Sequence, residues 1–310
     1  MGKTSSTRLK VGTRGSTLAL AQTEIATNAL SSVAGGPLET EVVRISTKGD
    51  AVIDRPFEAI GPKGVFAVEL QRALLDDRID VAVHSLKDLA AHEPDGLALA
   101  AVLERGEAAD VLVSREGLAI EELPAGAVVG TSSVRRRALI AIHRPDLETA
   151  PLRGNVDTRL EKIRRGEVDA GVLAAAGIVR LGRAEAITQW LDPMHFVPPP
   201  GQGAVVIEAR SDRLGGDLSW INGAEHTGTR ACVDTERWFM RLVEGGCEVP
   251  LGAWARHEDD EIVCEGFVAS EDGSRFVRDS ARGEDPDEVA RELARRVLDA
   301  GATELARRAR

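Results

Sequence analysis

The chain has 310 residues, too many for a single hydrophobic core, so we expect two or three domains. Its hydrophobic content of 43% and charged content of 29% are typical of a soluble globular protein, and no apolar run is long enough to cross a bilayer. The net charge of −11 argues against non-specific binding to nucleic acid. The N-terminus lacks an apolar signal core, which predicts a cytoplasmic protein.

The cysteines Cys232, Cys247 and Cys264 are odd in number and widely spaced, without a Cys-x-x-Cys pair. This spacing argues against a disulfide framework and against a zinc site, so no metal is expected. Lysine supplies only six of the 39 basic residues and arginine the other 33, a balance that fits a salt-adapted prokaryote or a genome of high G+C content.

The first elements predict an anion site. Residues 8–12 are expected to form a strand and residues 18–30 a helix, with Thr13, Arg14, Gly15, Ser16 and Thr17 between them. The first N–H groups of a helix lack partners, so a Gly/Ser/Thr turn there can hold an anion. Arg14 would add a fork-shaped cation. The alternative is a simple N-capped helix with a solvated arginine.

The next elements bring a lysine and an acid into the same half. A strand over residues 41–46 leads into a long loop, residues 47–64, whose glycines and prolines suit a mobile lid that carries Lys63. A helix over residues 66–75 and a buried strand over residues 79–84 follow. The strand delivers Lys87 and Asp88 at its carboxyl end, where α/β sheets bind ligands. The alternative is a surface ion pair of little energetic value.

The second half repeats this plan. Val129-Gly130-Thr131 copies Val11-Gly12-Thr13, and hydroxyls and arginines again precede a helix, which begins near Ser133. A helix over residues 156–165, a strand over residues 169–173, and then Gly177, Arg180 and a short helix follow. We therefore predict an α/β protein with two mirrored lobes facing each other across a cleft, as in periplasmic binding proteins. Residues 8–103 with 204–221 would form the first lobe and residues 109–197 the second.

A third region, residues 227–310, has a different pattern. A stiff proline-rich link over residues 198–203 leads to a strand over residues 204–209, which we expect to return to the first lobe. Then come a helix over residues 229–243, strands over residues 251–256, 262–269 and 275–280, and an amphipathic helix from residue 285 that breaks at Gly301. This order predicts a small α+β domain.

The loop Glu244-Gly245-Gly246-Cys247-Glu248-Val249-Pro250 lies in this third region. Two glycines leave the thiol of Cys247 uncovered, where a covalent partner can reach it. The alternative is a helix that ends at Gly-Gly with a cysteine after it by chance.

Cations and hydroxyls cluster at the loops and helix starts of both lobes. They are Arg14, Lys63, Arg135, Arg136, Arg153, Arg159 and Arg180, with Ser16, Ser132 and Ser133. Any one of these arginines could simply be solvated, but the set predicts a groove for a ligand that carries several carboxylates or phosphates. Asp88 would lie among these cations, where a positively charged intermediate needs an anion.

At these motifs the chain resembles the hydroxymethylbilane synthase family, also called porphobilinogen deaminases, over nearly its whole length. The resemblance rests on Thr13-Arg14-Gly15-Ser16, the loop over residues 61–66, Val83-His84-Ser85-Leu86-Lys87-Asp88, Gly130-Thr131-Ser132-Ser133-Val134-Arg135-Arg136, Leu152-Arg153-Gly154-Asn155-Val156-Asp157-Thr158-Arg159, Gly201-Gln202-Gly203, Glu236-Arg237 and residues 244–250. Departures from the family pattern are Ala59, Pro62 and Ala90, which concern the lid more than the chemistry.

The resemblance implies a transferase that polymerises four porphobilinogen molecules on a dipyrromethane cofactor, which a thioether attaches to Cys247. Hydrolysis then releases the linear tetrapyrrole. It implies that Asp88 is catalytic, stabilising cationic pyrrole nitrogens and assisting proton transfer. The implied cofactor contacts are Lys87, Ser132, Ser133, Arg135, Arg136 and Arg159. The implied substrate contacts are Arg14, Ser16, Lys63, Phe66, Arg153, Arg180 and Gln202. The expected molecule is a monomer with no nucleic-acid or membrane partner.

Two rival classes remain open on the residues alone. One is a two-lobed protein that binds a small anion reversibly, against which the missing signal peptide and Cys247 both argue. The other is a cysteine hydrolase, but the only histidine in a strong motif, His84, lies on a buried strand and suggests a structural role.

Overall fold

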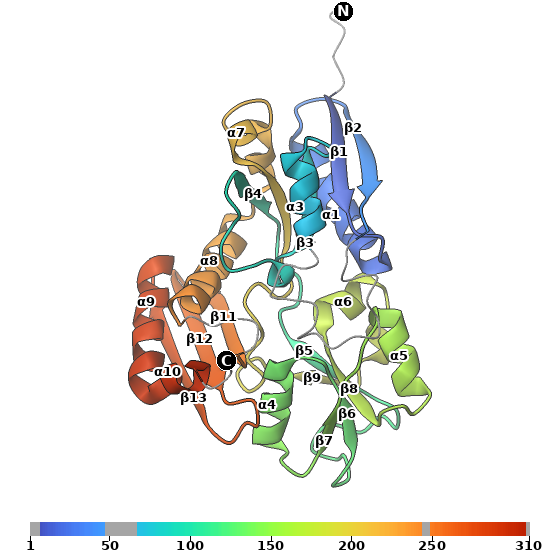
Figure 1. Ribbon diagram of the computed structural model, residues 1–310, viewed down its shortest axis with the longest axis vertical. Helices are drawn as coiled ribbons and strands as arrows, with labels where there is room; N and C mark the ends of the chain where they lie inside the picture. Colours follow the sequence, from blue (N-terminus) through green and yellow to red (C-terminus); the bar gives the residue numbers. More distant parts are fainter. Residues whose placement is uncertain (1–6, 47–66, 244–248, 308–310) are drawn as a thin grey trace, which may run out of the picture. The chain divides into compact units, whose positions relative to one another are not determined.

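The computed structural model describes residues 7–46, 67–243 and 249–307 (Figure 1). The expected lid, with Ala59, Pro62 and Lys63, lies outside these ranges, as do Phe66 and the loop that carries Cys247. The chain forms two compact units, the first from Met1–Arg105 with Ala204–Arg230 and the second from Gly106–Gly203 with Ala231–Arg310. The C-terminal region shares the second of these units with the second lobe, and the division into three domains expected from the sequence stays a prediction.

The first unit is built on a five-stranded sheet in the order β2-β1-β3-β10-β4. Its strands are β1 (Thr7–Thr13), β2 (Leu38–Arg44), β3 (Val81–Ser85), β4 (Leu97–Val102) and β10 (Val205–Arg210). β1, β2 and β3 run parallel, and β10 runs antiparallel between β3 and β4. The predicted return of the chain to the first lobe through residues 204–209 is therefore confirmed.

Helices cover this sheet. They are α1 (Thr17–Val33), α3 (Val68–Leu75) and the short α7 (Ser211–Leu214), with a 3₁₀ turn at Ser219–Ala224. Leu9 and Val11 of β1 pack with Leu30 of α1 and Ile207 of β10 in one core cluster. Apolar residues spaced for one face of a helix and alternating along β1 thus account for the packing.

The second unit repeats this sheet in the order β7-β6-β8-β5-β9. Its strands are β5 (Asp110–Ser114), β6 (Val128–Gly130), β7 (Glu148–Ala150), β8 (Ala170–Ala174) and β9 (Gln189–Leu191), and its helices are α4 (Val134–His143), α5 (Val156–Arg164) and α6 (Ala175–Arg180). β6, β7 and β8 are parallel, and β5 is antiparallel between β8 and β9. Matching β6 to β1 and β5 to β10 superposes the two strand orders, so the predicted duplication of α/β lobes is confirmed.

The equivalent glycines Gly12 and Gly130 explain why the repeated Val-Gly-Thr needs its middle residue. A Cβ on Gly12 would lie 2.2 Å from Ile79 Cδ1, and a Cβ on Gly130 would lie 3.0 Å from Leu152 Cβ. The side chain of Ile79 packs directly on the backbone of Gly12, and that of Leu152 on the backbone of Gly130, so a Cβ at either glycine would push its neighbour away.

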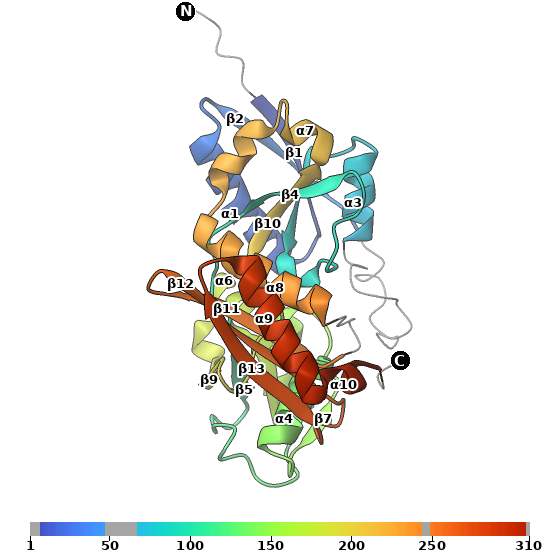
Figure 2. The ribbon, with the colours of Figure 1, turned by 90° about the vertical axis from the view of Figure 1, so that its left-hand side faces the viewer.

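The C-terminal region is a three-stranded antiparallel sheet with helices. β11 (Leu251–Glu258), β12 (Glu261–Ala269) and β13 (Phe276–Gly283) form the sheet, and α8 (Thr227–Leu242) precedes it. α9 (Pro286–Val297) lies along the sheet (Figure 2), and the chain breaks at Gly301, with φ of 102°, before α10 (Thr303–Arg307). Phe267 and Ala269 of β12 share a core cluster with Leu139 and Ile140 of α4. The C-terminal sheet and the second lobe therefore have a common core.

Two details of the expected element order need correction. Gly177 and Arg180 lie within a helix, α6, which follows β8 directly, and the short helix expected beyond them is the 3₁₀ turn at Ala184–Ala186. The sequence pattern did not predict β4 in the first lobe or β5, β7 and β9 in the second. Leu97–Val102 reads Leu-Ala-Leu-Ala-Ala-Val, a composition that suits a helix as well as a strand. The expected cleft concerns the relative placement of the two lobes and stays a prediction.

Candidate active site

The turn between β1 and α1 presents Arg14. Ser16 is the N-cap of α1 and accepts a hydrogen bond from the backbone N–H of Ala19 at 3.2 Å. The hydroxyl of Thr13 donates to the carbonyl oxygen of Ala19 at 3.3 Å. The two hydroxyls thus fix the turn from both sides, and Arg14 lies half-buried between them.

Lys87 and Asp88 lie on a single 3₁₀ turn, Leu86–Asp88, directly after β3. This is the carboxyl end of a parallel strand, as the sequence predicts. Both side chains are half-buried, and the turn is anchored by Leu86, which is buried and whose N–H donates to the carbonyl oxygen of Ala204 at 3.0 Å.

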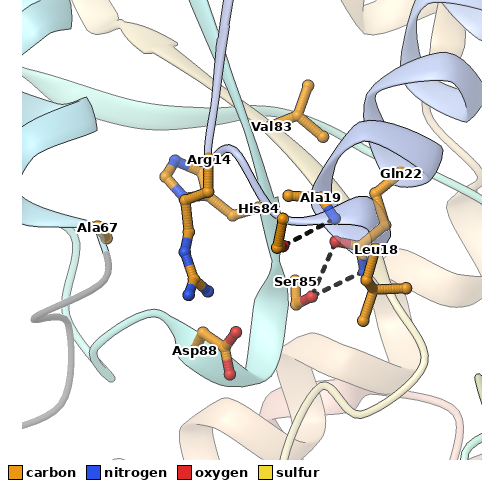
Figure 3. A pocket seen from close by; sticks show the side chains of 10 residues that line it. Arg14, Leu18, Ala19, Gln22, Ala67, Val83, His84, Ser85 and Asp88 are labelled. Carbon is orange, nitrogen blue, oxygen red and sulfur yellow. Dashed lines mark hydrogen bonds between the residues drawn. The ribbon is translucent and has the colours of Figure 1, made fainter. Parts of the chain in front are cut away.

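A pocket joins these two turns within the first unit. It is lined by Arg14, Ser16, Leu18, Ala19, Gln22, Ala67, Val83, His84, Ser85 and Asp88. The guanidinium of Arg14 and the carboxylate of Asp88 point toward one another across it (Figure 3). The side chains of Gln22 and Ser85 are hydrogen-bonded, with 2.7 Å between Nε2 and Oγ. A cation and an anion on opposite walls can bind an acidic substituent and stabilise positive charge in the same ligand.

A buried acid, Glu208, contacts the pocket residue His84. Nε2 of His84 lies 3.0 Å from Oε2 of Glu208 on β10, and Gln71 Nε2 donates to Glu208 Oε1 at 3.0 Å. His84 is 7% and Glu208 1% exposed. His84 therefore has a carboxylate partner inside the sheet, which fits the structural role that its buried strand predicts.

In the second lobe, hydroxyl and amide side chains cap the helices that carry the candidate arginines. Ser133 caps α4 and accepts from the N–H of Arg136, and Ser132 Oγ donates to the carbonyl oxygen of Leu152 at 3.2 Å. Asn155 caps α5, and Arg159 Nε donates to the carbonyl oxygen of Gly154 at 2.8 Å. Both helix starts are thus capped by a side chain, and their predicted role in holding an anion stays a prediction.

Arg135 and Arg136 share one buried acid, Asp110, which lies outside the motifs that the sequence shows. Arg135 Nη2 lies 2.5 Å from Asp110 Oδ2, and Arg136 Nη2 lies 2.6 Å from Asp110 Oδ1. Each guanidinium also donates to a backbone carbonyl, Arg135 to Val197 at 2.7 Å and Arg136 to Val172 at 3.0 Å. The arginines are 3% and 7% exposed and Asp110 is fully buried. Rather than lining an open groove as solvated side chains, they form a buried cluster.

The charges of this cluster do not balance. Burial alone would raise the pKa of Asp110, but the positive charges of Arg135 and Arg136 and their hydrogen bonds outweigh it, so its pKa lies well below the usual range. Burial lowers the pKa of Arg135, and the charge of Asp110 opposes that shift. Among the described residues, the buried Nε atoms of both arginines have no hydrogen-bond partner. Two cations against one anion leave an excess positive charge beside donors that remain available.

Gln202 and Arg180 make internal bonds near this cluster. Gln202 is fully buried, and its amide nitrogen lies 2.8 Å from Asp110 Oδ1 and 2.7 Å from the carbonyl oxygen of Ala108. Arg180 Nη2 donates to the carbonyl oxygen of Gly203 at 2.5 Å, and burial lowers its pKa. Their expected contacts with substrate stay predictions, and the contacts that the structure shows are within the protein.

Several predicted site residues are placed only partly or not at all. Arg153 is half-buried on the turn before α5. Cys247, Lys63 and Phe66 lie outside the described residues.

Across residues 7–46, 67–243 and 249–307, no group of His, Cys, Asp and Glu is arranged to hold a metal ion. Among the helices in those ranges, none has the length and apolar character that crossing a membrane requires.

A cation–anion pocket at the end of a parallel strand, in a duplicated α/β fold with paired arginines, is typical of proteins that bind anionic small molecules. Residues 9–215 match the family model described as porphobilinogen deaminase, dipyromethane cofactor binding domain, and residues 230–299 match porphobilinogen deaminase, C-terminal domain. The chain belongs to the porphobilinogen deaminase family.

Curated relatives with the name porphobilinogen deaminase span the same length. The protein from Desulforudis audaxviator is 46% identical over 303 residues, which cover 97% of each chain. The protein from Alkaliphilus metalliredigens is 41% identical over 300 residues, covering 96% of this chain and 94% of its own. A solved periplasmic solute-binding protein from Desulfovibrio salexigens is similar over 71% of this chain and 73% of its own, with 9% identity and a TM-score of 0.45.

Proposed function

We propose that this chain is a hydroxymethylbilane synthase, a transferase that deaminates porphobilinogen and joins four molecules head-to-tail into a linear tetrapyrrole. The observation that carries the proposal is the pocket in which Arg14 and Asp88 face each other, in a chain of the porphobilinogen deaminase family. Reversible anion binding, the rival class, is not favoured, because the relatives over nearly the whole length are named as deaminases.

The residues of the pocket suit the substrate chemically. Each porphobilinogen carries an acetate and a propionate, and a guanidinium binds a carboxylate through two parallel hydrogen bonds. Arg14 would bind such a carboxylate, with Ser16 beside it. Loss of ammonia from the aminomethyl group leaves a cationic pyrrole, and the Asp88 carboxylate on the opposite wall would stabilise that charge and accept or return its proton.

The residues also fit the cofactor of the family, dipyrromethane. The fit rests on the excess positive charge of Arg135 and Arg136 and on their buried Nε donors, which suit the carboxylates of two pyrrole rings. Arg135 and Arg136 would hold it, together with Lys87, Ser132, Ser133 and Arg159, and Cys247 would anchor it. When bound, this group supplies the primer whose free pyrrole carbon is extended.

The remaining assignments belong to the same proposal. Arg153, Arg180, Lys63, Phe66 and Gln202 are proposed substrate contacts. The molecule is proposed to be a cytoplasmic monomer with no nucleic-acid partner. The three-domain division at residues 8–103 with 204–221, 109–197 and 227–310 is proposed as well.

The test is the consumption of porphobilinogen by purified wild-type protein and by Asp88→Asn. The substitution keeps the shape of the side chain and removes its charge, so we expect turnover to fall at least about 100-fold while the covalent cofactor stays bound. Asp95→Asn, the same change at an exposed position outside the pocket, is the matched control. Near-normal turnover in Asp88→Asn would refute the assignment of Asp88.

A further inference from the structure

The short segment over residues 197–203 is bonded on two sides within the second unit. We call this segment the connector. On the side of the second lobe, the carbonyl oxygen of Val197 accepts from Arg135 Nη1 at 2.7 Å. Gln202 Nε2 donates to Asp110 Oδ1 at 2.8 Å. The connector therefore touches both a candidate cofactor-binding arginine and the acid that holds the arginine pair.

On its other side the connector is bonded to the C-terminal region. The N–H of Ala253 in β11 donates to the carbonyl oxygen of Pro198 at 2.8 Å. A Cβ on Gly252 would lie 2.6 Å from the carbonyl oxygen of Val197, so β11 approaches the connector backbone as closely as a glycine permits. A displacement of β11 must therefore displace the connector.

Glu236 of α8 joins these parts. It is fully buried, and each of its carboxylate oxygens accepts a hydrogen bond from a backbone N–H. Oε2 accepts from Gly201 of the connector at 2.7 Å, and Oε1 accepts from Ala255 of β11 at 2.8 Å. A bidentate carboxylate that binds two N–H groups holds them at a fixed separation, and such charge-assisted bonds are roughly twice as strong as neutral ones.

We propose that Glu236 is a positioning residue for the carboxylate-binding arginines. It fixes the connector, and the connector fixes Asp110 and Arg135 through Gln202 and Val197, so a buried acid that touches no ligand sets the geometry of the arginine pair. This inference rests on the proposed function, because the arginine pair is assigned there to the cofactor. Preorganised donors are effective only when a surrounding set of bonds holds them in place.

The experiment compares how fast apo-protein loads its covalent group, with porphobilinogen as the probe and intact mass as the readout. The variant is Glu236→Gln, which keeps the shape of the side chain but turns an amide N–H toward one of the two backbone N–H groups. We expect loading to slow at least fivefold, and kcat per loaded molecule to change less than the loading rate, because the pocket of Arg14 and Asp88 is untouched.

Glu265→Gln is the matched control. Glu265 is another buried acid of the C-terminal sheet, 5% exposed, whose nearest cations are Arg278 at 3.4 Å and Arg256 at 4.0 Å, and it has no bond to the connector among the described contacts. The loading rate of Glu265→Gln should stay within twofold of the wild-type rate, even if its thermal midpoint drops as far as that of Glu236→Gln. If Glu236→Gln does not fold, Glu236→Asp, which keeps the charge and retracts the carboxylate by one methylene, must show the same slow loading.

The outcomes separate the two proposals. If wild-type protein never gains mass with porphobilinogen, the proposed function fails and the role of Glu236 fails with it. If wild type loads and Glu236→Gln loads equally fast, only the positioning role is refuted. It is also refuted if Glu265→Gln slows loading in proportion to its lost stability, because Glu236 would then act through stability alone.

Discussion

Replacing Asp110 with asparagine should destabilise the second unit strongly. Asp110→Asn removes the only negative charge within hydrogen-bonding distance of two buried guanidiniums among the described residues, at 2.5 and 2.6 Å. Removing one partner of a buried ion pair costs about 3–5 kcal/mol, since the remaining charge stays desolvated without compensation. For a unit of this size, such a loss corresponds to a drop in thermal midpoint of about 10 °C.

The assay is unfolding by heat and by urea at neutral pH, followed by circular dichroism. Glu161→Gln is the control, because Glu161 also contacts two arginines, Arg164 and Arg165, but at the exposed surface of α5. No measurable change in stability is expected there. A midpoint for Asp110→Asn within 2 °C of wild type would refute the reasoning, because a buried uncompensated arginine pair cannot be that well tolerated.

The pH dependence of the stability difference between wild type and Asp110→Asn is a second check. The folded-state pKa of Asp110 is depressed below the unfolded value of 3.8, because the charges of Arg135 and Arg136 outweigh the opposing effect of burial. The carboxylate therefore contributes its full stability above about pH 4 and loses it as the pH falls further. The difference in free energy of unfolding between wild type and Asp110→Asn should be constant from pH 5 to 7 and should become smaller below pH 4. A difference that becomes smaller near neutral pH would show that a group other than Asp110 titrates.

Two further predictions concern stability. Gly252→Ala places a Cβ 2.6 Å from the carbonyl oxygen of Val197, so its free energy of unfolding in urea should fall by about 1–3 kcal/mol. Gly215→Ala is the control, because a Cβ there has no atom within 4 Å and the stability should change little. Equal unfolding midpoints for the two variants would contradict the close contact of β11 with the connector. Asp285 is the N-cap of α9, and its carboxylate accepts hydrogen bonds from the N–H groups of Asp287 and Glu288. Asp285→Ala should lower the free energy of unfolding by about 1 kcal/mol, and Asp285→Ser should restore most of that stability. A Ser variant no more stable than the Ala variant would show that lost capping does not explain the destabilisation.

The sequence predicts local features well, because local rules produce them. Ser16, Ser133 and Asp285 precede helices and cap them, since a short polar side chain can satisfy the first free N–H groups. The duplication of the lobes follows from the repeated Val-Gly-Thr and the element order. Asp88 at the end of a buried strand could be placed beside Arg14 because both follow parallel neighbouring strands.

Non-local partners could not be predicted. Asp110 lies 25 and 26 residues from the arginines that it binds and opens a strand, Asp-Val-Leu-Val-Ser, in which it reads as an ordinary boundary residue. Gln202 and Glu236 belong to recognisable motifs, but nothing in those motifs says which carbonyl or N–H each side chain will meet. A lone acid next to a buried apolar run is the one signal that could have drawn attention to Asp110, since such a charge needs a partner.

The position of β10 has a consequence for how this chain is made. β10 is the strand between β3 and β4, yet it begins at residue 205, whereas β4 ends at residue 102. At about 5–20 residues per second, the ribosome needs roughly 5–20 s to add the intervening segment. During that time β3 keeps an open edge and β4 lacks its neighbour, and open edges promote association with other chains. The first lobe can complete its sheet only after the whole second lobe has been synthesised.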